Sequence, residues 1–369
     1  MKYKLGDICE IVSGSTPKTS IPEYWDGDKK WITPAEINEE SYIITDSARK
    51  LTELGVKKTG LSPFPEGTVI LSSRAPIGKV AIAGCEMYCN QGFKNLICSE
   101  KINNRYLYWF LKGNTEFLNS LGRGATFKEV SKQIVSNIEI NVPSIAQQEQ
   151  AAIQLETANA IIRFRKQQLQ KLDELVKARF VELFGDESNP YNFPIVTIED
   201  VASVQVGVVI KPAQYYTDAG HGIKTFRSLN IGPMHIKDTD WVYFSEEGNR
   251  KNQKSVLNEN DLVIVRSGAP GTACVITKEY AGCNAVDIII ARPDLDKVNP
   301  YYLCQYTNLP HGKKQIEEGT GGAAQQHFNV GKYNKLQLML PPKTLQDEFG
   351  DFINQVDKSK LQYHLHTHT

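Results

Sequence analysis

The chain has 369 residues, of which 41% are hydrophobic and 23% are charged. This length and this balance are typical of two or three folded domains, and they exclude a wholly disordered chain. Lysine plus arginine equals aspartate plus glutamate, 42 against 42, which excludes a general nucleic-acid coat that relies on bulk positive charge but leaves room for a local basic face.

Short β-rich segments dominate the first part of the chain, residues 1–145. Strands are expected at residues 69–72 and 80–83, and the turn sequence Ala75-Pro76-Ile77-Gly78 separates them. A helix is expected at residues 104–112. This mixture predicts an α+β domain with a curled mixed sheet instead of regularly alternating strands and helices.

A long helix is predicted next, because residues 146–184 contain neither glycine nor proline and are mostly good helix formers. At ~1.5 Å per residue it would be about 57 Å long, and Gly185 follows it where a left-handed cap belongs. Apolar residues recur every seven positions, as in a coiled coil, so the helix needs a partner to bury them. The predicted helix seam consists of Leu155, Ile162, Leu169, Leu172 and Val176.

The following part, residues 186–344, repeats the first part in the same order. Leu5-Gly6-Asp7-Ile8 returns as Ile198-Glu199-Asp200-Val201, and Ser72-Ser73-Arg74 returns as Val265-Arg266-Ser267. Strands are expected at residues 262–265 and 287–291 and a helix at residues 300–307. The offset between the copies drifts only from 193 to about 199 residues, which indicates a duplication.

The C-terminal segment, residues 345–369, is predicted to form a shorter helix that packs antiparallel to the long one. Leu345-Gln346-Asp347-Glu348-Phe349 is matched to Ala146-Gln147-Gln148-Glu149-Gln150, and apolar residues continue along one helical face. The chain ends before a full copy of the long helix would, which leaves self-association through the shortened helix open.

Several sequence motifs resemble those of one family. Residues 5–17, with Tyr24-Trp25 and Trp31-Ile32-Thr33-Pro34, resemble the opening of a target-recognition domain. Residues 72–78 and 142–149 resemble later landmarks of the same domain. Together with the duplication and the long helix, the chain resembles the DNA-specificity (S) subunit of a type I restriction–modification system.

The resemblance implies two target-recognition domains, residues 1–145 and 186–344, a conserved spacer helix at 146–185 and a conserved C-terminal helix at 345–369. It implies a non-catalytic subunit that recognises two half-sites in double-stranded DNA and scaffolds two methyltransferase subunits and restriction–translocase subunits. No cofactor is expected on this chain, while S-adenosylmethionine and ATP with Mg²⁺ are expected on the partners. A ~57 Å helix at ~3.4 Å per base pair limits the distance between the two domains to about 17 base pairs. Because the domains have width and reach inward, we expect about 5 to 8 unread base pairs between the half-sites.

Two other function classes are weighed against this one. A self-contained methyltransferase needs an Asn/Asp-Pro-Pro-aromatic tetrad, and Ser188-Asn189-Pro190-Tyr191 and Asn299-Pro300-Tyr301-Tyr302 both lack the second proline. We therefore predict no catalytic residue. The other class is a structural adaptor with duplicated protein- or glycan-binding domains, and nothing in the residue pattern alone excludes it.

The candidate DNA contacts follow from side-chain chemistry, because arginine pairs with guanine, glutamine with adenine, and lysine or arginine with phosphate. Arg74 and Arg266 end a strand before a turn, where an internal ion pair is the competing interpretation. Glycine-rich segments near residues 122–124 and 319–322 suggest loops that face DNA or form plain connections. The candidates are Ser73, Arg74, Lys79, Arg123, Thr126 and Lys128 in the first domain, and Arg266, Ser267, Gln325, Gln326 and His327 in the second.

The remaining expectations concern membranes, thiols and metals. No apolar run reaches the ~18 residues of a membrane helix, and the first residues lack the apolar core of a signal peptide, so we expect a cytoplasmic protein without membrane contact. Seven cysteines without paired spacing predict reduced thiols. Cys85 and Cys89 lack a second pair of zinc ligands, so no metal site is predicted.

Overall fold

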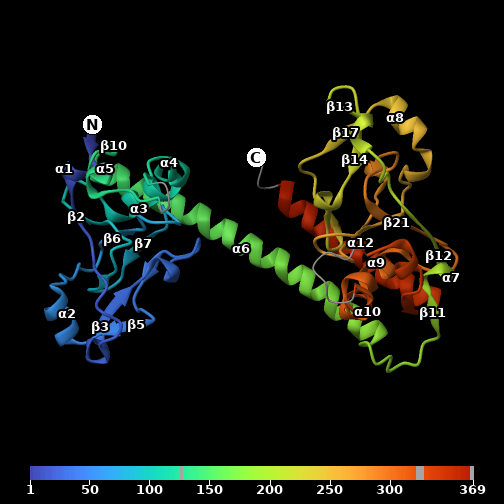
Figure 1. Ribbon diagram of the computed structural model, residues 1–369, viewed down its shortest axis with the longest axis horizontal. Coiled ribbons are helices and arrows are strands. Elements are labelled where there is room, and N and C mark those ends of the chain that lie inside the picture. The colour runs from blue at the N-terminus through green and yellow to red at the C-terminus, as the bar shows by residue number, and fades with distance from the viewer. Residues whose placement is uncertain (125–127, 321–327, 366–369) are drawn as a thin grey trace. The chain divides into compact units, whose positions relative to one another are not determined.

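The computed structural model describes residues 1–124, 128–320 and 328–365 (Figure 1). The chain divides into two compact units, Met1–Phe164 and Arg165–Thr369. Each unit contains one copy of the same α+β fold, which confirms the fold class expected from the repeat.

The first unit is built on a five-stranded mixed sheet of order β2-β9-β6-β7-β4. Three neighbouring pairs are antiparallel, and β4 is parallel to β7. A three-stranded sheet of order β5-β3-β8 and the pair β1-β10 complete it. The strands are β1 (Lys2–Lys4), β2 (Cys9–Val12), β3 (Trp25–Ile32), β4 (Ile43–Ile44), β5 (Arg49–Leu51), β6 (Val69–Leu71), β7 (Val80–Ala83), β8 (Tyr88–Cys89), β9 (Asn95–Cys98) and β10 (Glu139–Asn141).

One predicted helix of this unit, α3, packs on the mixed sheet. It begins after Asn103, whose side chain accepts hydrogen bonds from the backbone N–H groups of Arg105 and Tyr106, as a helix cap does. Leu107 and Leu111 of α3 are fully buried in the main core of the unit, with the sheet residue Leu96. The helices are α1 (Leu5–Ile8), α2 (Glu53–Thr59), α3 (Asn104–Gly113), α4 (Thr115–Ser120) and α5 (Lys132–Ser136).

The second unit repeats this arrangement with a four-stranded antiparallel sheet of order β12-β21-β18-β19. A second sheet has the order β13-β17-β14-β20, and β11 pairs with β22, as β1 pairs with β10 in the first unit. The strands are β11 (Ile195–Thr197), β12 (Ala202–Val206), β13 (Tyr216–Thr217), β14 (Ile223–Phe226), β15 (Ile231–Gly232), β16 (His235–Ile236), β17 (Val242–Phe244), β18 (Leu262–Val265), β19 (Ala273–Val275), β20 (Asn284–Ala285), β21 (Ile288–Pro293) and β22 (Gln337–Met339). The helices are α7 (Ile198–Val201), α8 (Glu246–Lys251), α9 (Pro300–Asn308), α10 (Pro310–Thr320) and α11 (Val330–Asn334).

Two buried glutamines show the duplication at the level of single hydrogen bonds. The Gln148 side chain accepts from the backbone N–H of Asn103 at 2.8 Å and donates to the carbonyls of Lys101 and Pro143. The Gln346 side chain accepts from the N–H of Asn299 at 2.9 Å and donates to the carbonyls of Lys297 and Pro341. Gln346 is therefore equivalent to Gln148, and the match of Gln346 to Gln147 made from sequence is wrong by one position.

The long helix α6 (Ile145–Phe184) begins in the first unit and ends in the second, as predicted for residues 146–184. Gly185 caps it with a positive φ of 80°, a conformation that glycine adopts without strain. The C-terminal helix α12 (Lys343–Leu365) packs beside the last part of α6 (Figure 1). Ion pairs join Arg179 to Glu348 and Asp173 to Lys360. Because the residue numbers run in opposite directions, the two helices are antiparallel, as predicted.

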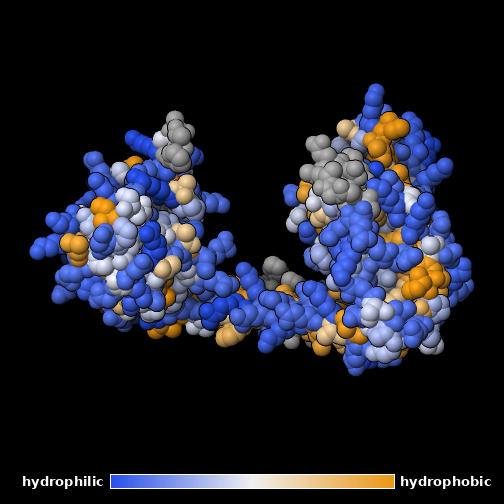
Figure 2. Space-filling view, turned by 60° about the horizontal axis from the view of Figure 1, so that its bottom comes forward, coloured by the Kyte–Doolittle hydropathy of each residue, from blue (hydrophilic) through white to orange (hydrophobic). Residues whose placement is uncertain are grey.

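Burial along the predicted helix seam differs between its two ends. Val176 is buried, and Leu172 packs against the core of the second unit. Leu169 is partly buried. Leu155 and Ile162 are 45% and 53% exposed, so the prediction that they form a buried seam is wrong within the described chain. Figure 2 shows apolar atoms at the surface of α6 among mostly hydrophilic ones.

The end of α6 is anchored in the core of the second unit by aromatic side chains. Phe180 and Phe184 are fully buried. The Phe180 ring stacks on Tyr302 of α9 at 5.5 Å and meets Phe349 of α12 edge-on at 5.4 Å. Such pairs stabilise beyond the area they bury, so α6, α9 and α12 form one packed group.

The described helices, cysteines and potential metal ligands relate to the expectations about membranes, thiols and metals. None of the helices in the described ranges combines the length and apolar composition that crossing a membrane requires. All seven cysteines are free thiols, five of them buried, and Cys85 and Cys98 are partly exposed. Within the same ranges, no three His, Cys, Asp or Glu side chains gather as metal ligands would.

Candidate nucleic-acid interface

The first-domain candidates gather at the turn that follows β6. The backbone N–H of Val130 donates to the carbonyl of Ser73 at 2.8 Å, and Arg123 and Glu129 exchange two backbone hydrogen bonds. Residues 123 and 128–130 are thereby held beside the Arg74 turn. Both Arg123 and Lys128 are exposed. The structure thus brings together three of the predicted cationic candidates, Arg74, Arg123 and Lys128.

Two other first-domain candidates are occupied inside the protein. Ser73 is fully buried and accepts a hydrogen bond from the ammonium group of Lys94 at 3.3 Å. Lys79 is partly buried, and its ammonium group donates to the carbonyl of Pro34 at 3.0 Å. Direct DNA contact by Ser73 would require its burial to change. Thr126 lies outside the described residues.

Arg74 forms the internal ion pair that was the competing interpretation, but only through part of its guanidinium group. Its Nε atom lies 3.0 Å from Glu129, and Lys94 lies 3.3 Å from the other oxygen of the same carboxylate. Burial opposes ionisation of Glu129, but the hydrogen bonds from Arg74 and Lys94 outweigh it and lower the pKa of this carboxyl. Within the described chain no partner contacts the terminal nitrogens of Arg74, whose side chain is 44% exposed. The terminal nitrogens of Arg74 can therefore still bind a ligand.

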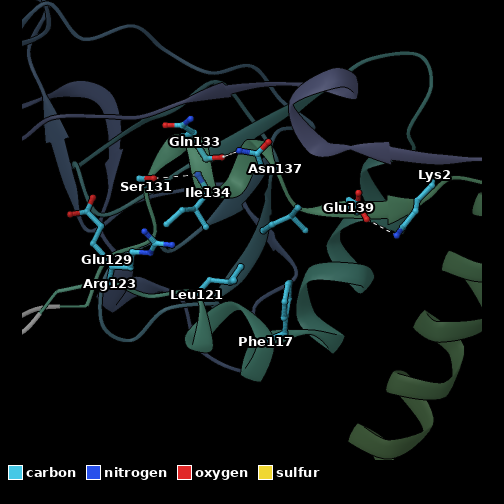
Figure 3. A pocket seen from close by; sticks show the side chains of 11 residues that line it. Lys2, Phe117, Leu121, Arg123, Glu129, Ser131, Gln133, Ile134, Asn137 and Glu139 are labelled. Atoms are coloured by element: carbon cyan, nitrogen blue, oxygen red, sulfur yellow. Dashed lines mark hydrogen bonds and ion pairs between the residues drawn. The ribbon is translucent and has the colours of Figure 1, made fainter.

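An open groove of about 910 Å³ lies beside this cluster (Figure 3). Arg123 and Glu129 lie at one end, and the Lys2–Glu139 ion pair lies at the other. Apolar side chains, Phe117 among them, line the wall between the two ends. The groove combines one exposed arginine with apolar walls, which suits the edge of a contact surface better than a closed pocket for a small molecule.

The second domain has the same arrangement at its own arginine turn. The backbone N–H of Phe328 donates to the carbonyl of Arg266 at 3.2 Å, as Val130 does to Ser73 in the first domain. The Arg266 guanidinium group donates to Asp287 and to the carbonyl of Phe328, and its side chain is only 16% exposed. Ser267 is partly buried, and Gln325, Gln326 and His327 lie outside the described residues, directly before Phe328.

Sequence reasoning missed the acidic partners of both arginines. Glu129 lies 55 residues after Arg74, and Asp287 lies 21 residues after Arg266. No local pattern marks such pairs. The duplication does not mark them either, because Glu129 follows the glycine-rich segment of the first domain whereas Asp287 precedes that of the second.

Comparison with known proteins bears on these two similar turns. The family described as the type I restriction modification DNA specificity domain matches residues 1–174 and, a second time, residues 171–366. The chain belongs to this family. The double match confirms both the resemblance and the duplication inferred from the sequence, and the arginine turns thus occupy corresponding places in two type I DNA specificity domains.

Individual relatives agree with this assignment. The chain is similar to the type I restriction enzyme MjaIX specificity subunit of Methanocaldococcus jannaschii, with 28% identity over 95% of this chain and 85% of that protein. It also resembles the crystal structure of the type I restriction–modification S subunit from M. genitalium, with a TM-score of 0.60, 14% identity, and coverage of 99% of this chain and 91% of that one. A structure solved in a study of complex assembly of a type I restriction–modification system gives a TM-score of 0.54, 17% identity and the same coverage. These two structures support the fold alone.

Proposed function

We propose that this chain is the specificity subunit of a type I restriction–modification system. Its two target-recognition domains, residues 1–145 and 186–344, each bind one half of a bipartite sequence in double-stranded DNA, and the chain itself carries out no chemical step. The observation that carries the proposal is that one chain contains two specificity domains, each with an arginine turn whose backbone carbonyl accepts a hydrogen bond from a residue later in the chain, Val130 or Phe328. A duplicated binding domain on one chain is suited to two half-sites at a fixed separation.

The base and phosphate contacts of the first half-site are assigned by exposure and by unused donors. In the first half-site they come from Arg74, Arg123 and Lys128, because the terminal nitrogens of an arginine can bond a guanine edge in bidentate fashion and exposed cations anchor phosphates. In the second half-site the contacts are assigned by side-chain chemistry and by correspondence with the first domain, to the Arg266 turn with Ser267 and to residues 325–327, although Arg266 already donates to Asp287.

The spacer is assigned to α6, residues 146–185 of the proposed division, and its length sets the number of base pairs left unread. The 40 residues of α6 at ~1.5 Å each span at most about 18 base pairs of ~3.4 Å. The two recognition domains would cover part of that length, which leaves a gap of about 5 to 8 unread base pairs. The C-terminal helix, residues 345–369, supports α6 through the antiparallel contacts described above.

The proposed partners are two methyltransferase subunits, which would supply S-adenosylmethionine, and restriction–translocase subunits, which would supply ATP and Mg²⁺. The free cysteines suit a reducing cytoplasm, where such a complex would meet DNA. The exposed apolar residues of α6 keep open self-association as well as partner binding.

The test is a binding measurement with the full chain in complex with its methyltransferase subunit, on duplexes in which both half-sites and their separation are randomised. We expect one split sequence to be enriched, with affinity that falls steeply as salt rises. A protein- or glycan-binding adaptor would show neither property, and enrichment of a single unsplit sequence would contradict the two-domain proposal.

A further inference from the structure

Glu156 of α6 is held by two side chains of the first unit. Arg105 of α3 donates to one carboxylate oxygen from Nε at 2.6 Å and to the other from a terminal nitrogen. The hydroxyl of Tyr42 donates to the same carboxylate. A bidentate arginine–carboxylate interaction fixes the orientation of the two side chains as well as the distance between them. We call Tyr42, Arg105 and Glu156 the helix latch.

The latch residues are themselves held in place. The hydrogen bond from Arg105 lowers the pKa of Glu156, and burial, followed by the bond to Glu156, raises the pKa of Tyr42 to about 12. The Tyr42 ring packs edge-on against Tyr108 of α3 at 4.8 Å. The carboxylate therefore stays ionised and the phenol protonated at neutral pH, which is the pairing that the geometry requires.

Within the described residues, the latch and Gln148 are two hydrogen-bonded attachments on one face of α6. Gln148, Ala152 and Glu156 are spaced by four residues, and such residues share a helix face. Gln148 and Ala152 are fully buried. The two hydrogen-bonded residues lie about 12 Å apart along the axis at ~1.5 Å per residue. One attachment would let the helix pivot, whereas two attachments fix its direction.

The second unit keeps the first attachment and lacks the latch. With the Gln148–Gln346 equivalence, Glu156 corresponds to Asn354 of α12. Arg105 corresponds to Tyr301, because each donates its backbone N–H to the preceding cap asparagine. Tyrosine and asparagine cannot form an ion pair, and both instead line a shallow groove of about 260 Å³. Between the two corresponding helices, the latch belongs to the one that connects the two units.

We propose that Tyr42, Arg105 and Glu156 are positioning residues that fix the direction in which α6 leaves the first domain, and so fix the number of base pairs between the half-sites. The proposal rests on the proposed function. From Glu156 to Phe180 the helix rises ~36 Å, so a tilt of about 10° displaces its far end by ~6 Å, close to two base-pair steps of ~3.4 Å. A small loosening at the latch therefore becomes a spacing error on DNA.

The experiment measures methylation by the full chain with its methyltransferase subunit on DNA carrying the preferred half-sites at separations from two base pairs shorter to two longer. With Glu156→Gln we expect the same half-site sequences, and a roughly fivefold to tenfold rise in methylation at neighbouring separations relative to the preferred one. Tyr42→Phe, which keeps the ring packing, should give a smaller rise. Glu149→Gln, on an exposed residue of the same helix, is the matched control and should leave the profile unchanged.

A second measurement separates the latch from the proposed function. Fluorescent labels in each unit should report a broader distance distribution for Glu156→Gln than for the parent chain, and the exchanged pair Arg105→Glu with Glu156→Arg should narrow it again. A parent-like spacing profile together with a parent-like distance distribution in Glu156→Gln would overturn the latch. If the parent chain shows no preference for one separation of the half-sites, but the distance distribution broadens in Glu156→Gln, the result would count against the proposed function and not against the latch.

Discussion

One carboxylate sets the electrostatics of the proposed first half-site contact. Glu129 neutralises the buried Lys94 and holds one side of Arg74, while no other described residue contacts the terminal nitrogens of Arg74. Because Lys94 is nearly buried, it needs this partner. Glu129 therefore both satisfies a buried charge and orients an arginine toward a ligand.

Replacing Arg74 tests this arrangement. Arg74→Ala should cost about 1–3 kcal/mol of discrimination at one base pair of the first half-site, because a bidentate base contact is worth that much. Arg74→Lys keeps the positive charge but loses the bidentate guanidinium geometry. It should therefore lose discrimination between bases at that position while keeping its salt-dependent affinity for DNA. Enrichment sequencing of bound duplexes checks both variants. Relaxed recognition in both half-sites at once would contradict the assignment.

Acid should reveal the role of Glu129 in stability. Its pKa in the folded chain lies below the ordinary value of 4.5, so its stabilising contribution is complete above that pH and is lost as pH falls through the lower folded value. The difference in unfolding free energy between the parent chain and Glu129→Gln should stay constant from pH 7 to about pH 5.5 and shrink below about pH 4.5. Denaturant unfolding across this pH range measures the difference in unfolding free energy. A difference that grows toward low pH would contradict the stabilising role of ionised Glu129.

At the scale of the elements, each unit is joined to a helix by a buried glutamine. Gln148→Leu would leave two carbonyls and one N–H without their partner, so we expect the first unit to lose about 2–4 kcal/mol of stability. Gln346→Leu should cost the second unit a similar amount. Gln150→Leu, at an exposed position of α6, is the control. Domain-resolved hydrogen exchange distinguishes the two units, and equal effects of Gln148→Leu and Gln150→Leu would contradict this account.

Local patterns predicted the central strands and the longer helices but not every burial. The β-rich runs at residues 80–83 and 262–265 coincide with β7 and β18, and the predicted helices at residues 104–112 and 300–307 end one residue before α3 and α9 do. Heptad spacing also predicted α6, but it does not say how far a partner helix extends along it. The burial predicted for Leu155 and Ile162 failed for that reason. The Arg74–Glu129 pair was missed because it joins distant parts of the chain.

At the scale of the whole chain, the length of α6 between its two anchored ends is the quantity that a deletion can change. Removing residues 161–167 keeps the heptad register and leaves Glu156 and Val176 in place. The helix would shorten by ~10 Å at ~1.5 Å per residue, so the preferred gap should shrink by about three base pairs of ~3.4 Å. Methylome sequencing measures the gap, and unchanged spacing or an altered half-site would contradict the spacer assignment.

The shared glutamine joint has an evolutionary consequence. In both copies the domain contacts its helix through one glutamine, which accepts one backbone N–H and donates to two carbonyls. A genetic crossover at this position would therefore join domains from two different parents while keeping these hydrogen bonds. Such a hybrid would inherit the preference of each parent separately. Such recombination can generate new DNA specificities from existing domains, and the connecting helices need not change.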